Sequence, residues 1–317
     1  MKIPDVQKKE LLEIIKKYIL DKKLDYKFIE SGIENVNYLI KINKKKFVLR
    51  IYNEARKPED IEAEIKVIDY LSKNNIPTPK VIPNLKKESL TEHNGRYAVM
   101  FSFVEGEQPP LGVMDSLLAK DIGVNLADMH HLLLSFKGEF RRFVPPSTSF
   151  EEIGERGIID KKIIIHKKEV EGELNSLPLK NLRECIVHSD ITRENIKIKD
   201  SSISAFLDFD DLHKDYLVWD VAIAITHLFI TKTFGIDWKG LKYFFDGYNA
   251  TLSLTDLEKE ALVPLMKLRN VKLAMLVNYR RKKNLGNIDS LLSIEGSVLR
   301  KLDLIKKNES RLMKVLS

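Results

Sequence analysis

The segment IVHSDITRENIKI, residues 186–198, most constrains how this chain can fold, because it places polar residues between two apolar runs. His188, Asp190 and Asn195 stand in its centre, and isoleucine and valine dominate both ends. Apolar runs of this kind predict buried strands, and the polar centre predicts a loop at the edge of a core. Because a rigid scaffold positions such a loop, its side chains are the first candidates for a functional site.

The chain changes from alternating to helical patterns near residue 105. Before this point the sequence predicts helices at about 5–20 and 57–74 and strands at 27–33, 36–42, 46–52 and 96–104. After it, the sequence predicts helices at about 114–135, 159–176, 215–231, 236–249, 255–283 and 288–308, and short strands at 185–188, 195–199 and 203–208. The Gly/Pro-rich segment 105–110 is the predicted boundary. We therefore expect an α+β fold with a small antiparallel β-rich lobe at 1–104 and a larger, mainly helical lobe at 105–317, the layout of protein-kinase-like folds.

Composition narrows the possible functions. With 317 residues, of which 44% are hydrophobic, the chain can bury a sizeable core, and no apolar run approaches the roughly 18 residues that span a bilayer. Cys185 is the one cysteine, which excludes an internal disulfide and thiolate metal sites. The net charge of +7 comes from scattered lysines that form no basic block, which favours an anionic substrate over nucleic acid. We expect a cytoplasmic monomer or homodimer that binds a small molecule and neither membrane nor nucleic acid.

The polar loop has the residue spacing of a phosphoryl-transfer site. His188-x-Asp190, followed five residues later by Asn195, matches the kinase catalytic-loop pattern H-x-D-x-x-x-x-N. A carboxylate in such a loop accepts the proton of an attacking hydroxyl group, and an amide oxygen coordinates the Mg²⁺ that bridges the phosphates of ATP. We therefore assign Asp190 as the base and Asn195 as a metal ligand. His188 is expected to hold the loop.

A second acidic site follows the loop along the chain. The apolar segment AFL, residues 205–207, ends in Asp208, and Asp210 and Asp211 come directly after Phe209. Carboxylate oxygens at the end of a strand suit a hard cation. We predict that Asp208 holds Mg²⁺ together with Asn195, and we leave open whether Asp210 also binds the metal.

Three segments of the sequence resemble the aminoglycoside phosphotransferase and choline kinase superfamily: HSDITREN at 188–195, LDFD at 207–210 and DYLVWDVA at 215–222. The resemblance covers nearly the whole chain, and GIENVNYL at 32–39 with FVLRIY at 47–52 is most similar to homoserine kinase type II. Two departures stand out: Ser189 replaces the usual glycine, and Asp210 and Asp211 stand where homoserine kinases often carry an aromatic residue. The resemblance implies ATP-dependent, Mg²⁺-dependent phosphorylation of a hydroxyl group.

The resemblance also suggests how ATP is held. Gly32, Asn35 and Asn37 lie at a turn between two predicted strands, where backbone N–H groups can face phosphate oxygens. Arg50 stands where many kinases have a lysine for the α- and β-phosphates, and the choline kinase-like branch often has arginine there. The expected partner of Arg50 is Glu64, seven residues before Leu71 on the predicted helix. The backbone near Ser102 and Val104 is expected to bind adenine.

The acceptor is the least determined part of the reaction. Homoserine is our first expectation; choline or ethanolamine, hydroxylysine and an aminoglycoside are alternatives, and so is a pseudokinase that binds the nucleotide without turnover. Homoserine would need an acidic and a basic partner near Asp190, whereas choline would need an aromatic box. The candidates are Asp210 and Asp211 for the amine, Arg269, Arg280 and Arg281 for the carboxylate, and Tyr216, Trp219 and Tyr279 for a box. Asp220, in an apolar helix, is expected to accept hydrogen bonds from the catalytic-loop backbone, and Arg193 is a candidate for stabilising the transferred phosphoryl group.

Overall fold

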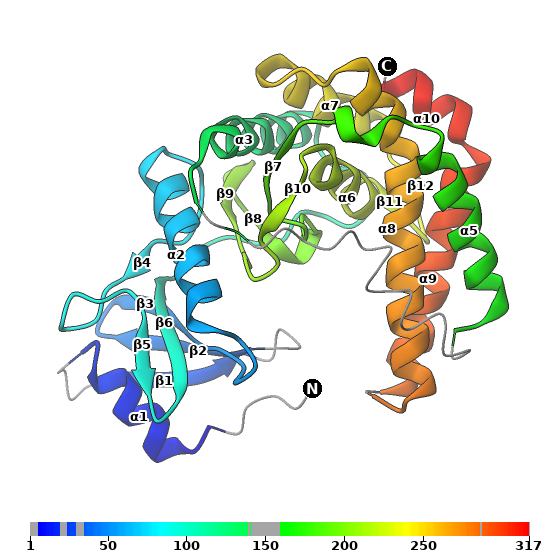
Figure 1. Cartoon of the computed structure of the whole chain (residues 1–317). Coiled ribbons are helices and arrows are strands. Elements are labelled where there is room, and N and C mark those ends of the chain that lie inside the picture. The colour runs from blue at the N-terminus through cyan, green and yellow to red at the C-terminus, as the bar shows by residue number, and fades with distance from the viewer. Residues whose placement is uncertain are drawn as a thin grey trace. The chain divides into compact units, whose positions relative to one another are not determined.

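The computed structural model describes residues 6–19, 24–29, 35–138, 140, 159–285 and 287–316. The chain divides into two compact units (Figure 1). Unit 1 contains residues 1–106 together with 204–210, and unit 2 contains 107–203 and 211–317. The segment 204–210 joins unit 1 through a hydrogen bond from the Phe206 N–H to the Pro77 carbonyl oxygen, at 2.8 Å. The sequence pattern gave no indication of this return.

Unit 1 is built on an antiparallel sheet. Its strands follow the order β1 (Leu24–Ile29), β2 (Val36–Ile42), β3 (Lys45–Ile51), β6 (Arg96–Ser102) and β4 (Val81–Ile82), and β5 (Thr91–His93) also pairs with β6. The helix α1 (Lys8–Lys16) places Leu11, Ile14 and Ile15 against alternate residues of the sheet, as its apolar spacing requires. The core residues around this contact are Tyr18, Val36, Ile40, Ile42, Leu49, Ile51, Ala98 and Met100. The antiparallel sheet predicted for this part of the chain is confirmed.

The helix α2 (Pro58–Lys73) forms where the apolar spacing predicted it. Pro58 stands in its first turn, where the missing N–H costs nothing, and Glu59 and Asp60 favour the same end through the helix dipole. The apolar residues at helical spacing are buried: Ile61, Ile65, Ile68 and Leu71. Glu64 lies on the same face and is 1% exposed, so this helix buries a carboxylate in unit 1.

Unit 2 is mainly helical. Its helices are α3 (Ser116–Ser135), α5 (Lys161–Asn175), α6 (Val218–Leu228), α7 (Trp238–Thr251), α8 (Asp256–Lys282), α9 (Ile288–Lys307) and α10 (Glu309–Leu316). The other elements between residues 179 and 236 are η1 (Leu179–Asn181), β7 (Glu184–Val187), η2 (Arg193–Asn195), β8 (Ile196–Lys199), β9 (Ser202–Phe206), β10 (His213–Tyr216), β11 (Ile230–Thr231) and β12 (Gly235–Ile236). α8 begins with a capping box formed by Thr255 and Glu258. No helix among the described residues is long and apolar enough to cross a membrane.

The helix predicted at 215–231 is wrong at both ends. Asp215 and Tyr216 belong to β10, which pairs with β7 in antiparallel register, and residues 230–231 form β11. Pairing with a strand about 30 residues earlier overrides the local helical preference of this segment. The helix α6 keeps only the continuous apolar stretch between these strands, and it carries Trp219 and Asp220 in its first turn.

Two glycines allow α3 and α7, adjacent in Figure 1, to pack closely. A Cβ atom on Gly123 of α3 would lie 2.1 Å from the carbonyl oxygen of Phe244, and one on Gly247 of α7 would lie 2.3 Å from that of Lys120. This close approach brings His130 of α3 to Tyr248 of α7, where the imidazole Nδ1 and the hydroxyl oxygen are 2.7 Å apart.

Gly123→Ala is expected to lower the free energy of unfolding by about 1–3 kcal/mol, because its methyl group has no room beside the Phe244 carbonyl. Gly172 of α5 is the matched control, since a Cβ there meets nothing within 4 Å. Gly172→Ala should raise stability by up to about 1 kcal/mol, because alanine is the better helix former. Urea unfolding followed by circular dichroism measures both variants. Equal effects would contradict the close packing.

Candidate active site

The polar loop between β7 and β8 brings Asp190 and Asn195 together. The Asn195 side-chain amide donates to the Asp190 carboxylate oxygen Oδ2 at 2.7 Å and to the Asp190 carbonyl oxygen at 3.0 Å. The short helix η2 makes this contact possible, because it turns the chain back just before Asn195. His188 is fully buried, and its Nδ1 lies 3.3 Å from the Asp190 N–H, which it accepts. The structural role expected for His188 fits this contact.

Arg269 occupies the second oxygen of the Asp190 carboxylate. Its Nη2 atom lies 2.7 Å from Asp190 Oδ1. Sequence reasoning named Arg269 as an acceptor ligand and missed this ion pair, because the two residues are 79 positions apart. Arg281 pairs instead with Asp160 and Glu295, and Arg280 donates to the Leu285 carbonyl.

Asp220 holds the backbone of the catalytic loop, as the sequence predicted. Its two carboxylate oxygens accept the N–H groups of His188 at 2.7 Å and Ser189 at 2.6 Å. The imidazole Nε2 of His130 lies 3.2 Å from Asp220 Oδ2. Burial raises the pKa of Asp220, but the His130 hydrogen bond and the charges of His130 and His188 outweigh it and hold the pKa below its usual value. A buried carboxylate that is ionised in this way is a rigid acceptor for the loop.

Ser189 explains one departure from the family pattern. Its backbone has a φ of +65°, in the left-handed region where glycine costs least. A hydrogen bond offsets part of the cost of this backbone conformation, because the indole N–H of Trp219 donates to the Ser189 hydroxyl oxygen at 3.1 Å. The loop therefore keeps the conformation that the usual glycine adopts easily.

In unit 1, Arg50 contacts several of the predicted ATP-site residues. Arg50 and Asn37 are paired across β3 and β2, and the Arg50 Nε–H donates to the Asn37 side-chain oxygen at 3.2 Å. Arg50 Nη1 lies 3.0 Å from Asp208 Oδ1, 2.6 Å from Asp210 Oδ1 and 3.8 Å from Glu64 Oε1. Burial lowers the pKa of Arg50, but the two aspartates more than offset this and hold it well above its ordinary value.

The carboxylates around Arg50 are more numerous than this cation can neutralise. Glu64 also lies 3.5 Å from Arg56 and accepts the Tyr52 hydroxyl at 3.0 Å. Burial raises the pKa of Glu64 to about 8, Asp210 adds to the shift, and Arg50 and Arg56 oppose it. Asn35, which the sequence assigned to the phosphates, donates to Asp210.

The remaining predicted residues are less closely gathered. Gly32 lies outside the described residues. Ser102 ends β6, and its N–H and hydroxyl bond to the Lys80 carbonyl and N–H. Val104 follows the strand and makes no hydrogen bond with any described residue. Arg193 donates to the Pro109 carbonyl at 3.1 Å, which ties it to the Gly/Pro-rich segment.

Comparison with known proteins places this geometry in a family. The model of the phosphotransferase enzyme family matches residues 25–249. The chain belongs to the phosphotransferase enzyme family. A homoserine kinase of Bradyrhizobium diazoefficiens is 25% identical over 272 residues, covering 83% of this chain and 81% of the relative.

Solved structures show the same fold. An amicoumacin kinase has a TM-score of 0.75 at 16% identity, with 95% of this chain and 93% of that chain covered. A microcompartment-associated aminopropanol kinase has a TM-score of 0.74 at 15% identity, with 97% and 99% covered. The predicted kinase-like α+β fold is confirmed. The protein is an ATP-dependent phosphotransferase that acts on a hydroxyl group of a small molecule.

A nucleotide and a divalent metal ion accompany this activity, and the donor set fits a hard cation. Asp208 and Asp210 direct one oxygen each at the same nitrogen of Arg50, which shows that both can reach a common positive charge. Among the described residues there is no group of three or more acidic, histidine or cysteine side chains that forms a complete metal cage.

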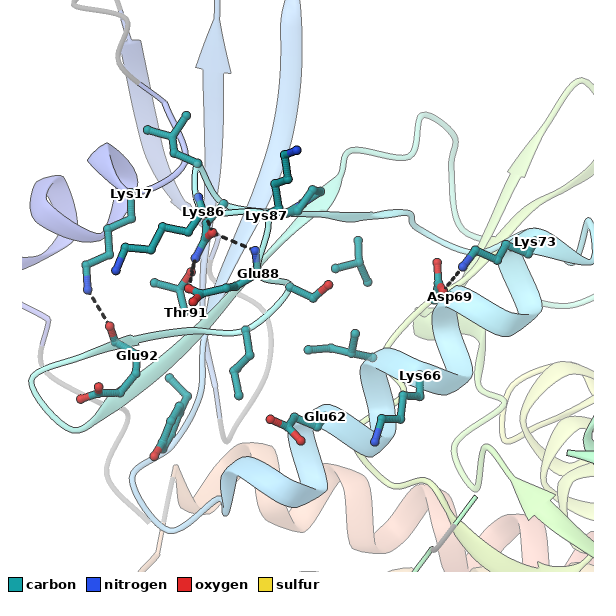
Figure 2. A pocket seen from close by; sticks show the side chains of 18 residues that line it. Lys17, Glu62, Lys66, Asp69, Lys73, Lys86, Lys87, Glu88, Thr91 and Glu92 are labelled. Atoms are coloured by element: carbon teal, nitrogen blue, oxygen red, sulfur yellow. Dashed lines mark hydrogen bonds and ion pairs between the residues drawn. The ribbon is translucent and has the colours of Figure 1, made fainter. Parts of the chain in front are cut away.

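A separate hollow of about 1200 Å³ lies in unit 1, between α2 and the segment 83–92 (Figure 2). Its wall contains opposite charges that are already paired, as with Asp69 and Lys73 at 2.5 Å, and Lys17 donates to the Glu92 carbonyl. None of the predicted site residues lines it. We therefore do not assign it to the reaction.

Asp220→Asn is expected to lower the free energy of unfolding by about 1–3 kcal/mol, because its NH₂ group cannot accept an N–H of the loop. The kcat should fall at least about tenfold, equivalent to ~1.4 kcal/mol of activation free energy, with a much smaller change in the Kd of ATP. Asp246→Asn, at an exposed ion pair on α7, is the control. Denaturation, steady-state kinetics and nucleotide titration measure these effects. A wild-type kcat would show that Asp220 does not set the geometry of the loop.

Proposed function

We propose that the protein transfers the γ-phosphoryl group of ATP to the hydroxyl group of homoserine, with Mg²⁺ as the metal ion. The relative from Bradyrhizobium diazoefficiens, named as a homoserine kinase and aligned over 83% of this chain, carries the choice of acceptor. Arg269 beside Asp190 supports it, because homoserine brings a carboxylate to the reaction. Use of ATP supports the cytoplasm as its location.

Asp190 is the proposed base. Its carboxylate takes the proton of the acceptor hydroxyl while the new oxygen–phosphorus bond forms and the bond between the β–γ bridging oxygen and the γ-phosphorus breaks. The Asn195 amide, 2.7 Å from Oδ2, fixes the direction of the carboxylate. This arrangement positions the base before the acceptor arrives, which is the main contribution that a protein makes to phosphoryl transfer.

The nucleotide is proposed to bind to the residues around Arg50. The Arg50 guanidinium pairs with the α- and β-phosphates, and Glu64 orients it. Asn37, which accepts a hydrogen bond from Arg50, and Asn35 are proposed to bind the phosphates as well. Gly32, outside the described residues, is proposed to bind them through its backbone N–H. Adenine is proposed to bond to the backbone at Ser102 and Val104. Asn195 and Asp208 are the proposed Mg²⁺ ligands. When bound, Mg²⁺ neutralises the charge that develops on the phosphate oxygens.

Trp219 argues against choline as the acceptor. A quaternary ammonium needs an open aromatic face, but the ammonium of Lys272 lies 4.4 Å from the centre of the Trp219 ring, which is 4% exposed. The protein therefore already supplies the cation for this ring. The presence of Asp190, Asn195 and Asp208 together likewise argues against a pseudokinase.

The acceptor is tested by ADP release with MgATP and a panel of alcohols that contains L-homoserine, choline, ethanolamine, hydroxylysine and an aminoglycoside. L-Homoserine should give the highest kcat/KM, by at least about tenfold. A higher value for any other alcohol would overturn homoserine as the substrate.

Asp190→Ala is the matched control for this panel. Turnover of every acceptor should fall at least about 1,000-fold, at the level of a lost general base, with the Kd of ATP within about threefold of wild type. A variant that keeps most of its kcat would show that another group is the base.

Asp208→Asn is expected to weaken metal binding and turnover together, because the proposed ligand loses its charge. The Mg²⁺ concentration for half-maximal activity should rise about tenfold, or ~1.4 kcal/mol. Titration of activity with Mg²⁺ at fixed ATP measures this. An unchanged Mg²⁺ dependence would identify another carboxylate, such as Asp210, as the main ligand.

A further inference from the structure

Lys272 of α8 is a buried cation that has no ion-pair partner in the part of the chain that the structure describes. Its side chain is 8% exposed, and no acidic side chain of the described residues forms an ion pair with it. Burial lowers its pKa to about 7, with Asp215 opposing the shift and Arg269 adding to it. Burying an ammonium without an opposite charge is costly. Such a group points to a ligand that supplies the missing negative charge.

Lys267 on the same helix is a second buried lysine, and it differs from Lys272 in its ion pairs. Its side chain is 2% exposed, and its ammonium bonds to Glu173 at 2.9 Å and Glu309 at 2.8 Å. Two carboxylates therefore neutralise Lys267, whereas no carboxylate of the described residues forms an ion pair with Lys272, less than two turns later. The two buried lysines of α8 thus differ in their charge environment among the described residues.

Trp219 links Lys272 to the catalytic loop. The Lys272 ammonium lies over the indole ring, and the indole N–H donates to Ser189, the residue directly before Asp190. Arg269 stands three residues before Lys272, so both cations project from one face of α8. Both are therefore fixed on the side of the loop that carries the base.

Two further groups lie near Arg269, the ion-pair partner of Asp190. Lys301 of α9, which donates to the Thr226 carbonyl at 3.2 Å, has its pKa lowered to about 8 by burial; Glu194 opposes this shift and Arg269 adds to it. His227 lies 3.4 Å from Arg269, and burial, Lys301 and Arg269 lower its pKa well below the usual value, which keeps it neutral. Arg269 thus pairs with the carboxylate that must act as a base, and Lys272 and Lys301 lie close enough to Arg269 for their charges to interact with it.

We propose that Arg269 and Lys272 form the binding site for the carboxylate of the acceptor, and that Arg269 leaves Asp190 when this carboxylate binds. This inference rests on the proposed use of an amino-acid acceptor. In the free protein Arg269 holds Asp190 Oδ1, and only Oδ2 faces Asn195. A partly exposed ion pair contributes little net free energy, about 1 kcal/mol or less, so an incoming carboxylate can replace it. An acceptor without a carboxylate leaves the base paired.

The test compares L-homoserine with 3-aminopropan-1-ol, which has the same hydroxyl and amine and lacks the carboxylate. Wild type should prefer L-homoserine by at least about 100-fold in kcat/KM. Lys272→Gln should lower kcat/KM for L-homoserine about 10- to 100-fold, mainly through KM, and lower that for 3-aminopropan-1-ol less than about twofold. Lys272→Met, which keeps the aliphatic stem on Trp219, repeats the test if the glutamine variant folds poorly. Lys259→Gln, at an ion pair near the start of α8, is the control and should change neither value.

Arg269→Gln tests the release of the base. It should lower kcat/KM for L-homoserine about 10- to 100-fold and raise that for 3-aminopropan-1-ol, because Asp190 is no longer paired. A purely structural role, or a role in binding the transferred phosphoryl group, would lower both acceptors equally and overturn the proposal. An unchanged preference in both the Arg269 and Lys272 variants would also overturn it.

A binding measurement separates this inference from the proposed function. L-2-Aminobutyrate has the carboxylate and amine of homoserine and no hydroxyl, so calorimetry reports its binding without turnover. Its Kd should rise about 10- to 100-fold in Lys272→Gln. If wild type phosphorylates neither acceptor, homoserine is the wrong substrate, and L-2-aminobutyrate binding that depends on Lys272 would still support the carboxylate site. Equal turnover of both acceptors by wild type would overturn the carboxylate site alone.

Discussion

The buried carboxylate of Asp220 is the interaction on which the catalytic loop depends. A charge in an apolar helix is costly, and this cost is offset because the carboxylate accepts two loop N–H groups and faces His130. These bonds hold Ser189 in a left-handed conformation, and this conformation fixes the direction of the backbone that leads to Asp190. The close packing of α3 and α7 supports the same network, because it brings Tyr248 to the other side of His130.

Local spacing predicted the parts of the site that the chain builds within one segment. The five-residue spacing from Asp190 to Asn195 assigned both residues to one loop, and in the structure their side chains meet. The resemblance to the kinase family singled out Glu64 as the partner of Arg50, and the structure places Glu64 on the buried face of α2, 3.8 Å from Arg50. In both cases the two residues lie close together in the sequence.

Sequence reasoning missed several other long-range contacts. The ion pair of Arg269 with Asp190 joins residues from α8 and the loop, and neither segment contains a pattern that names its partner. The strand at 213–216 was not predicted for the same reason, since it forms only because β7 is available to pair with it. The return of 204–210 to unit 1 likewise depends on a backbone bond to Pro77. Sequence patterns indicate which face of an element is buried, but not what covers that face.

The two units carry opposite charge imbalances at their functional residues. In unit 1, three carboxylates share Arg50 and Arg56, and the pKa of Glu64 is raised to about 8. In unit 2, Arg269 pairs with Asp190, Lys272 and Lys301 lie close enough to Arg269 for their charges to interact with it, and the pKa of Lys272 is lowered to about 7. The ion pair of Arg183 with Glu258, by contrast, has one charge of each sign. Because an imbalance destabilises the free protein, its persistence is explained by ligands of the opposite sign. An excess of carboxylates suits a metal cation, and an excess of cations suits an acceptor that carries a carboxylate.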